Sequence, residues 1–324
     1  MSLLDRRSRR TTAIALVLLA AACAKKDEAP ADAPPARDPN SPLFTVNTGL
    51  STPESVLWDA TRSVWYISNI NGNAPEKDNN GYIVRVGANG EAKDSVPFIK
   101  GGAGDITLHA PKGMALQGDT LWVADIDALR GFNVTTGQPV ASVSLEKLGA
   151  TFLNDVAIGP DGLVYITDSG ISFDAQGNVT HPGKSRMFAV NGRAAVEAVV
   201  FPKESAANGI GWSAARAGWV MVGFNTQTVF EWKPDTKEAT TIGTGPGGGD
   251  GLLVLADGRV VYSSWADSSL NVFADGKTTT LRKGLPQPAD LGFDPARNVV
   301  AVPLFGANRV EFWPIDTPAP APAP

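Results

Sequence analysis

The sequence predicts an all-β fold, a six-bladed β-propeller built from four-stranded antiparallel blades. Three observations support this prediction: a short motif occurs six times, strand-like runs follow each copy, and the composition favours turns. The 324 residues include 34 Gly and 24 Pro, and only 19% of them are charged. A mainly helical protein of this length would hold more Glu, Lys and Leu.

The repeated motif has a small or turn residue, a polar residue, a small or acidic residue and then a short apolar run. Its six copies are PESVLWD from Pro53, PKGMALQ from Pro111, LNDVAIG from Leu153, ANGIGWS from Ala207, GDGLLVL from Gly249 and PADLGFD from Pro288. After each copy come a turn, a second strand rich in β-branched and aromatic residues, and a third strand of alternating pattern. A fourth strand is visible in most units. Each unit therefore has the size and pattern of one propeller blade.

The last unit holds only three strands, whereas the segment LFTVNTG from Leu43 stands as an extra strand before the first unit. We expect this N-terminal strand to become the outer strand of the sixth blade, because closing the ring leaves no free sheet edge. The alternative is an open array of the β-sandwich type. The first and third units carry the insertions NINGNAPEKDNNG and SGISFDAQGNVTHPGK between their second and third strands. Such insertions gather on one rim, where loops often carry function.

The N-terminus reads as a targeting segment. Four Arg residues precede an apolar run that ends at Ala22 and is too short to span a bilayer. Residues 1–22 resemble a bacterial lipoprotein signal peptide, in which the following Cys23 becomes the lipidated N-terminus. Cys23 is the only cysteine of the chain, so no intrachain disulfide forms. The alternative is an ordinary cleaved signal peptide with an incidental cysteine.

Residues 23–42 form a Pro/Ala-rich tether, and residues 317–324 a disordered Pro/Ala tail, which leaves 43–316 for the propeller. Because Ala24 and not Asp follows the cysteine, we expect an exported lipoprotein anchored in the outer membrane and facing the periplasm. The membrane is then one partner, through the lipid. The net charge of −5 and the absence of a basic run beyond the first residues argue against a nucleic-acid partner.

The second residue of each motif is the main functional signal, because the first strand of a blade lines the central channel. In chain order these residues are Glu54, Lys112, Asn154, Asn208, Asp250 and Ala289. Converging carboxylates repel each other in a buried site unless a cation neutralises them. Carboxylate and amide oxygens suit Ca²⁺, although another divalent metal is compatible, and the absence of His and Cys disfavours zinc and copper. The predicted ligands are Glu54, Asn154, Asn208 and Asp250. The alternative is that Asn208 and Asp250, each followed by Gly, are turn formers.

At these motifs the chain from about Leu43 to Ile315 resembles the regucalcin/gluconolactonase (senescence marker protein) family of six-bladed propellers, and more distantly the paraoxonases. PESVLWD resembles the Glu-bearing opening strand of that superfamily, and LNDVAIGPDG, ANGIGWS and GDGLLVLADG resemble its later blade starts. For regucalcin-like enzymes the resemblance implies metal ligands at Glu54, Asn208 and Asp250, with Asn154 facing substrate. For paraoxonases it implies calcium ligands at all four positions.

Two departures bear on the substrate. Gluconolactonase-like members have an Arg where this chain has Phe152, so we expect a more apolar ligand contacting Phe152. Paraoxonase-like members have a catalytic His where this chain has Lys112. His109 lies just upstream and is the candidate to reach the channel mouth and contact substrate; its alternative is a surface position, as for His181.

The implied activity is calcium-dependent hydrolysis of a small-molecule lactone or ester. The metal would polarise the carbonyl, and a nearby carboxylate would activate water. Asp168, at the end of YITD, resembles an acidic paraoxonase residue near the metal, and Asp125 occupies the same place one blade earlier. Either is a candidate base, with a strand-end turn acid as the alternative, and Lys112 is a candidate donor to the oxyanion. The alternative function is a non-catalytic ligand-binding or scaffold propeller with a structural metal.

The lipidation signal gives a first test. Because the thiol of Cys23 is the only acceptor, Cys23→Ser should abolish incorporation of radiolabelled palmitate and release the protein from the membrane fraction of a bacterial host. Wild-type protein and an Ala24→Ser variant, which keeps the thiol, should both label. Labelling of the Cys23→Ser protein would contradict the signal.

Overall fold

The computed structural model describes residues 38–174, 176 and 178–316. The chain divides into Met1–Pro39 and Asn40–Pro324, and all the strands belong to the second unit. Cys23 and the signal segment 1–22 lie outside the described residues, as do most of the tether and the tail 317–324. Within the described part, no helix is both long and apolar enough to cross a membrane.

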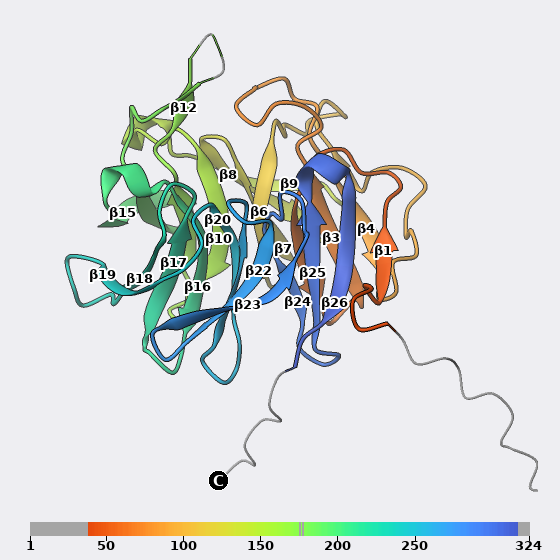
Figure 1. The fold of residues 1–324 in the computed structure, drawn as a ribbon. Helices are drawn as coiled ribbons and strands as arrows, with labels where there is room; N and C mark the ends of the chain where they lie inside the picture. The colour runs from red at the N-terminus through yellow and green to blue at the C-terminus, as the bar shows by residue number, and fades with distance from the viewer. Residues whose placement is uncertain (1–37, 175, 177, 317–324) are drawn as a thin grey trace, which may run out of the picture. The chain divides into compact units, whose positions relative to one another are not determined.

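Six four-stranded antiparallel sheets form the blades of the propeller, as predicted (Figure 1). Blade 1 contains β2 (Pro53–Asp59), β3 (Val64–Asn69), β4 (Tyr82–Gly87) and β5 (Ile99–Lys100); blade 2 contains β6 (Pro111–Gln117), β7 (Thr120–Asp125), β8 (Ala128–Asn133) and β9 (Pro139–Ser144); blade 3 contains β10 (Leu153–Ile158), β11 (Val164–Asp168), β14 (Arg186–Asn191) and β15 (Ala194–Val200).

The second half of the ring repeats this order. Blade 4 contains β16 (Ala207–Ser213), β17 (Gly218–Gly223), β18 (Thr228–Trp232) and β19 (Thr240–Thr244); blade 5 contains β20 (Gly249–Val254), β21 (Val260–Ser264), β22 (Ser269–Ala274) and β23 (Lys277–Lys283); blade 6 contains β24 (Gly292–Asp294), β25 (Val299–Leu304), β26 (Arg309–Pro314) and β1 (Phe44–Val46). Helix is limited to the 3₁₀ turns η1 (Glu146–Leu148), η2 (Lys203–Ser205) and η3 (Phe305–Ala307) in the described residues.

The N-terminal strand closes the ring, which confirms the prediction. β1 pairs antiparallel with β26 at Thr45↔Glu311, so the first and last strands of the propeller lie side by side (Figure 1). The Phe44 ring stacks on Phe312 with centroids 4.1 Å apart. This pairing covers the edge of β26 that would otherwise be exposed.

Aromatic side chains pack the interfaces between successive blades. Tyr165 of blade 3 contacts Trp219 of blade 4 at a centroid distance of 4.3 Å, and Trp65 of blade 1 contacts Phe312 of blade 6 at 5.2 Å. Such residues are buried in apolar clusters that each span two adjacent blades. The hydrophobic effect therefore acts around the whole ring, since no blade covers both of its own faces.

The inner strands converge closely at the third motif position. This position therefore holds either a small residue or an Asp whose carboxylate is hydrogen-bonded. A Cβ atom on Gly209 would lie 2.3 Å from the carbonyl oxygen of Asp250, and one on Gly251 would lie 2.4 Å from the Cα of Asp290. This approach explains why Gly or Ser stands at four of the six third positions of the motif.

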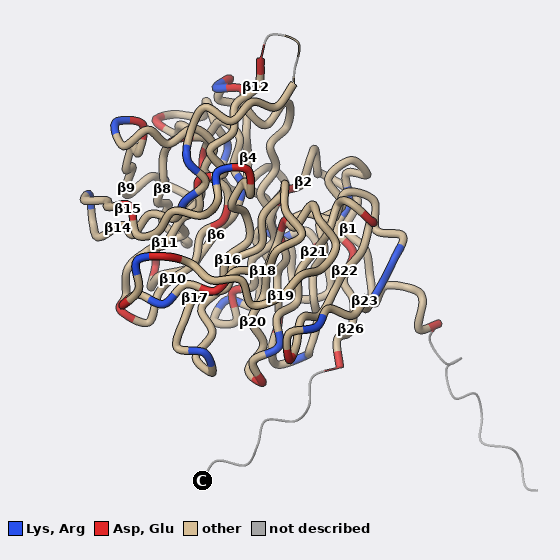
Figure 2. The backbone as a smooth tube through the Cα atoms, turned by 60° about the vertical axis from the view of Figure 1, so that its left-hand side comes forward, with Lys and Arg blue, Asp and Glu red and all other residues tan. Residues whose placement is uncertain are grey.

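Both predicted insertions lie between second and third strands. The loop of residues 70–81 joins β3 to β4, and a hairpin of β12 (Ser172–Phe173) and β13 (Val179–Thr180) lies between β11 and β14. They rise from the same rim of the ring (Figure 1). Charged residues of both signs are interspersed along the loops and strand ends (Figure 2).

Ring closure can be tested by truncation. A chain beginning at Ser51 lacks β1 and leaves the β26 edge and the Phe312 ring uncovered. We expect its urea midpoint to fall by an amount equivalent to several kcal/mol, on the order of the loss of a buried aromatic contact plus a strand pairing. A chain beginning at Asn40 is the control and should unfold as the full-length protein does. Equal midpoints for the two truncated chains would refute the closure.

Candidate metal site and cavity in the central channel

The second motif residues of blades 1 to 5 lie together on one cavity of about 680 Å³ at the centre of the ring. These residues, here called the cavity floor, are Glu54, Lys112, Asn154, Asn208 and Asp250, and all of them are buried. Ala289 of blade 6 is buried but does not line the cavity. The structure thus brings the four predicted ligand residues to one place, from blades 1, 3, 4 and 5.

An irregularity in the strand ladder accompanies each of these residues. In blades 1 to 5 the register between the first and second strand shifts at the second and third motif positions, as between Pro53 and Ser55 or between Gly249 and Leu252. A β-bulge redirects the side chain at which the pairing breaks. The same local distortion therefore aims five side chains at the axis.

Three oxygen atoms of the cavity floor are buried without a hydrogen-bond partner: Glu54 Oε2, Asn208 Oδ1 and Asp250 Oδ1. An unpaired buried polar atom is costly, and such atoms mark places where an ion or water binds. Asn154 donates its amide N–H to Ser169 Oγ at 3.4 Å, and Ser169 donates in turn to the carbonyl of Ala207 at 2.7 Å. The unpaired oxygens are hard ligands of the kind that Ca²⁺ takes, so the residues fit this ion.

The fit rests on a mixed set of carboxylates and amides. In the described part of the chain, no three His, Cys, Asp or Glu side chains form a group that could hold a metal. The candidate site instead combines two carboxylates with two amides, and Ca²⁺ accepts amide oxygens readily.

A second pair of buried carboxylates, Asp155 and Asp290, occupies the third motif position in blades 3 and 6. Asp155 accepts backbone N–H groups from Val156 at 2.6 Å and Ile210 at 2.7 Å. Asp290 accepts the hydroxyl of Ser55 at 2.5 Å. Neither residue was among the predicted site residues; the signal in the sequence was an acid at a motif position that otherwise holds Gly or Ser.

Burial governs the ionisation of these acids. It raises the pKa of Glu54 well above its usual range, and the negative charges of Asp250 and Asp290 raise it further. Burial and Asp290 raise the pKa of Asp250 to about 8. Burial raises the pKa of Asp290 to about 7, and burial together with Asp290 raises the pKa of Asp155 strongly. Without a bound cation, some of these buried carboxyl groups are therefore protonated and neutral.

Lys112 supplies the one positive side chain of the cavity floor. Its ammonium donates to the carbonyl of Ala110 at 3.1 Å and lies 4.3 Å from the centre of the Phe152 ring. Burial lowers the pKa of Lys112, against the opposing effect of the Glu54 carboxylate. Phe152, predicted to contact substrate, does line the cavity.

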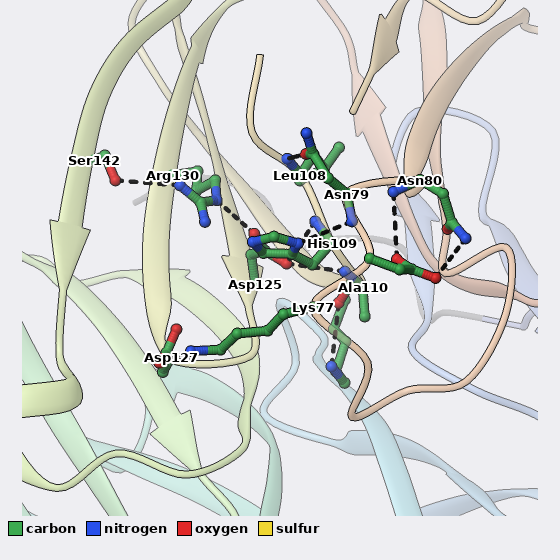
Figure 3. Close-up of polar contacts among 12 residues, drawn as sticks. Lys77, Asn79, Asn80, Leu108, His109, Ala110, Asp125, Asp127, Arg130 and Ser142 are labelled. Atoms are coloured by element: carbon green, nitrogen blue, oxygen red, sulfur yellow. Dashed lines mark hydrogen bonds and ion pairs between the residues drawn. The ribbon is translucent and has the colours of Figure 1, made fainter. Parts of the chain in front are cut away.

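Asp125 and Asp168 are buried, but neither lines the cavity. Asp125 Oδ1 accepts the N–H groups of His109 and Ala110 at 3.0 and 2.9 Å, and its Oδ2 pairs with Arg130 (Figure 3). Asp168 Oδ1 accepts the N–H of Phe152 at 3.0 Å, and its Oδ2 pairs with Arg186 at 3.1 Å. Both acids brace the segment that leads into an inner strand, away from the space where a substrate would lie.

His109 is also absent from the cavity lining. Its Nδ1 accepts the N–H of Asn79, whose side chain oxygen accepts the N–H of Leu108 at 2.8 Å (Figure 3). Lys77 of the same loop pairs with Asp127 of blade 2. These contacts fasten the blade-1 insertion to blade 2, so His109 positions a loop whose residues 72–76 line the cavity.

The upper part of the cavity is formed by residues that the motif reading did not single out. The residue directly after the second strand lines the cavity in five blades; these are Ile70, Ser169, Phe224, Trp265 and Phe305. The signal available in the sequence was an apolar residue at this position in every unit except the third.

Comparison with known proteins agrees with the propeller fold. The family model of the SMP-30/Gluconolactonase/LRE-like region matches residues 52–293. No curated protein matches the sequence.

Solved structures share the fold at low sequence identity. A candidate gluconolactonase is 17% identical with a TM-score of 0.61, covering 84% of this chain and 91% of its own. A calcium-binding protein, regucalcin from Agrobacterium tumefaciens, is 18% identical with a TM-score of 0.60, covering 81% and 84%. Virginiamycin B lyase from Staphylococcus aureus is 12% identical with a TM-score of 0.57, covering 84% and 87%.

The raised carboxyl pKa values predict how the metal-free protein responds to pH. The pKa of Asp250 rises from 3.8 to about 8 on folding, so the folded state holds a proton that the unfolded state releases. Stability from this group is present below pH 4 and lost as the pH rises toward 8. In chelator, the urea midpoint should therefore be lower at pH 8 than at pH 5.5, and added Ca²⁺ should restore it more at pH 8.

Asp250→Asn should weaken this pH dependence, because the amide does not titrate. Asp257→Asn changes an exposed loop acid of the same blade and should leave the dependence intact. A midpoint that does not change with pH in the wild-type protein would contradict the buried, proton-holding floor.

Proposed function

The chain belongs to the SMP-30/gluconolactonase/LRE-like family, and from this premise we propose that it is a calcium-dependent hydrolase of lactones or esters. The observation that carries the proposal is the meeting of Glu54, Asn154, Asn208 and Asp250 on one cavity, with three of their oxygens unpaired. The calcium-binding regucalcin among the similar structures supports a divalent cation in this fold.

Glu54, Asn154, Asn208 and Asp250 would hold the ion, whose two positive charges balance the two carboxylates. Bound there, Ca²⁺ would polarise the substrate carbonyl. Lys112 has one hydrogen bond to Ala110 and further N–H donors on the same ammonium, so it is suited to donate to the developing oxyanion.

In the proposed reaction, a carboxylate of the cavity floor activates the attacking water. Asp125 and Asp168 are each engaged by an Arg and by backbone N–H groups outside the cavity, which argues against the expectation that one of them is the base. Glu54 and Asp250 are the buried acids that face the cavity, and each has one unpaired oxygen, Glu54 Oε2 and Asp250 Oδ1. We assign the base to this pair of acids, since hydrogen-bond reach matters before pKa.

The second candidate function is binding of a small ligand without turnover, with the metal in a structural role. One observation favours this function: neither Asp125 nor Asp168 lines the cavity, so neither is placed to act as a general base. The family relationship favours the hydrolase, because members named gluconolactonase imply small-molecule lactones.

We also propose that the propeller is an exported lipoprotein, attached to the outer membrane through Cys23 and facing the periplasm. The sequence before Cys23 supports this placement.

Asp250→Ala provides the test of the proposed function. It removes one ligand oxygen and one charge, so calcium affinity by titration calorimetry should fall at least about tenfold, the ~1.4 kcal/mol expected when a charge-assisted contact is lost. Hydrolysis of a lactone and aryl ester panel, present with Ca²⁺ and lost in chelator, should also be lost in this variant. Asp257→Ala should preserve both properties.

A protein that binds Ca²⁺ through these residues yet hydrolyses no member of the panel would favour the ligand-binding function. A protein that does not bind Ca²⁺ at all would exclude both forms of the proposal.

A further inference from the structure

We propose that the upper part of the cavity is an apolar collar that selects substrates with an alkyl or aryl group over polyhydroxylated ones, an inference that rests on the function proposed above. The collar consists of Phe152, Phe224, Trp265, Phe305, Ile70 and Ala74, all of which line the cavity. It would hold the apolar part of a lactone or ester while the carbonyl reaches the floor.

Four collar residues come from one repeated position of the fold. Ile70, Phe224, Trp265 and Phe305 each follow directly after the second strand of a blade. The backbone N–H of each donates to the carbonyl of the residue just before the motif of the same blade, as from Phe224 to Ala206 at 2.9 Å and from Trp265 to Gly248 at 2.8 Å. The repeat therefore places these side chains at equivalent positions of blades 1, 4, 5 and 6, on the same cavity as the floor.

Side-chain contacts close the collar on itself. Trp265 lies between Phe224 and Phe305, at centroid distances of 5.3 and 5.5 Å. Phe224 packs against the buried cluster that contains Phe152, and Phe305 packs against the cluster that contains Ile70. Ala74 packs against both clusters and joins the two ends. Phe173 of the blade-3 hairpin extends the apolar surface from Phe152, at 5.8 Å.

The collar is built before any ligand binds. The loop that carries Ala74 is held by Lys77 to Asp127 and by Asn79 to His109 and Leu108 (Figure 3). A fixed wall loses little conformational freedom on binding, so more of the apolar contact appears as affinity.

Most polar side chains of the cavity belong to the other two levels, and Ser169 of blade 3 is the polar residue at the repeated collar position. The floor is polar and buried, whereas the polar lining residues of the insertions and of blade 4, Asn73, Glu76, Asp174 and Asn225, are exposed at the rim. Ser169 Oγ and Trp265 Nε1 are polar atoms at this level, so most hydroxyl groups of a sugar lactone would lie against apolar side chains and lose hydrogen bonds to water. A methylene at the same level gains by leaving water.

The test compares lactones that share one ring and differ in the alkyl chain: γ-butyrolactone, γ-octalactone and γ-dodecalactone, with D-glucono-1,5-lactone as the polyhydroxylated substrate. With saturating Ca²⁺, kcat/KM should rise up to about fourfold per methylene until the collar is filled, the equivalent of ~0.8 kcal/mol per buried CH₂. The sugar lactone should be the poorest of the four. A kcat/KM that is higher for D-glucono-1,5-lactone than for γ-dodecalactone would overturn the proposed collar.

Phe305→Ala should lower the ratio of γ-dodecalactone to γ-butyrolactone turnover about tenfold or more, because it opens the collar. Phe98→Ala is the matched control, since Phe98 is a half-buried aromatic residue of blade 1 that does not line the cavity. It should leave the ratio unchanged. An unchanged ratio in Phe305→Ala would also count against the collar.

A binding experiment separates failure of the collar from failure of the hydrolase. Cyclopentanone and 2-octylcyclopentanone present a ring carbonyl but no cleavable C–O bond, and their affinities for the calcium-loaded protein can be measured by calorimetry. The octyl ketone should bind on the order of 100-fold more tightly, and Phe305→Ala should remove most of this gain.

If the ketones show this difference but no lactone is hydrolysed, the collar stands and the hydrolase does not. If lactones are hydrolysed while neither ketones nor lactones depend on chain length, the hydrolase stands and the collar is overturned.

Discussion

Repulsion between buried carboxylates on the ring axis is the constraint on which the site depends. Glu54 and Asp250 face the cavity. Asp155 and Asp290, the third motif residues of blades 3 and 6, are buried as well. In a low-dielectric interior these groups cannot all remain ionised without compensation. The structure contains two means of compensation, protons on carboxyls whose pKa is raised and the ammonium of Lys112. A divalent ion at the unpaired oxygens, as proposed above, would be a third. The hydrolase proposed for this chain uses the third.

The same type of residue serves different purposes according to its place on a blade. Asp125 and Asp168 end second strands, where an Arg from the third strand and backbone N–H groups satisfy them. Asp250 opens a first strand, where the register shift turns it toward the cavity and leaves Oδ1 unpaired. An acid whose partners are all supplied by the chain braces the fold; an acid with an unmet oxygen can bind a ligand.

The repeat organises the cavity in levels. The second motif position supplies the polar floor, and the position after the second strand supplies the apolar collar. The insertions of blades 1 and 3 add Ala74 and Phe173 on the same rim. One blade thus contributes a floor oxygen and a collar side chain within a single hairpin, as Asn208 and Phe224 do in blade 4. In the proposed hydrolase, chemistry and substrate selection would therefore be linked, because both come from the same pair of strands.

The sequence by itself determined the propeller, its six units, the closing strand at Phe44 and the convergence of Glu54, Asn154, Asn208 and Asp250. These follow from hydrophobic periodicity and from a repeat, both of which are local properties of the chain. Only the tertiary structure decided the hydrogen-bond partners of Asp125, Asp168 and His109, the burial of Asp155 and Asp290, and the assembly of the collar. Each of these depends on partners from another strand or blade, such as Arg130 for Asp125 or Asn79 for His109. Hydrogen-bond satisfaction and side-chain packing are set by neighbours in space, which a repeat pattern does not specify.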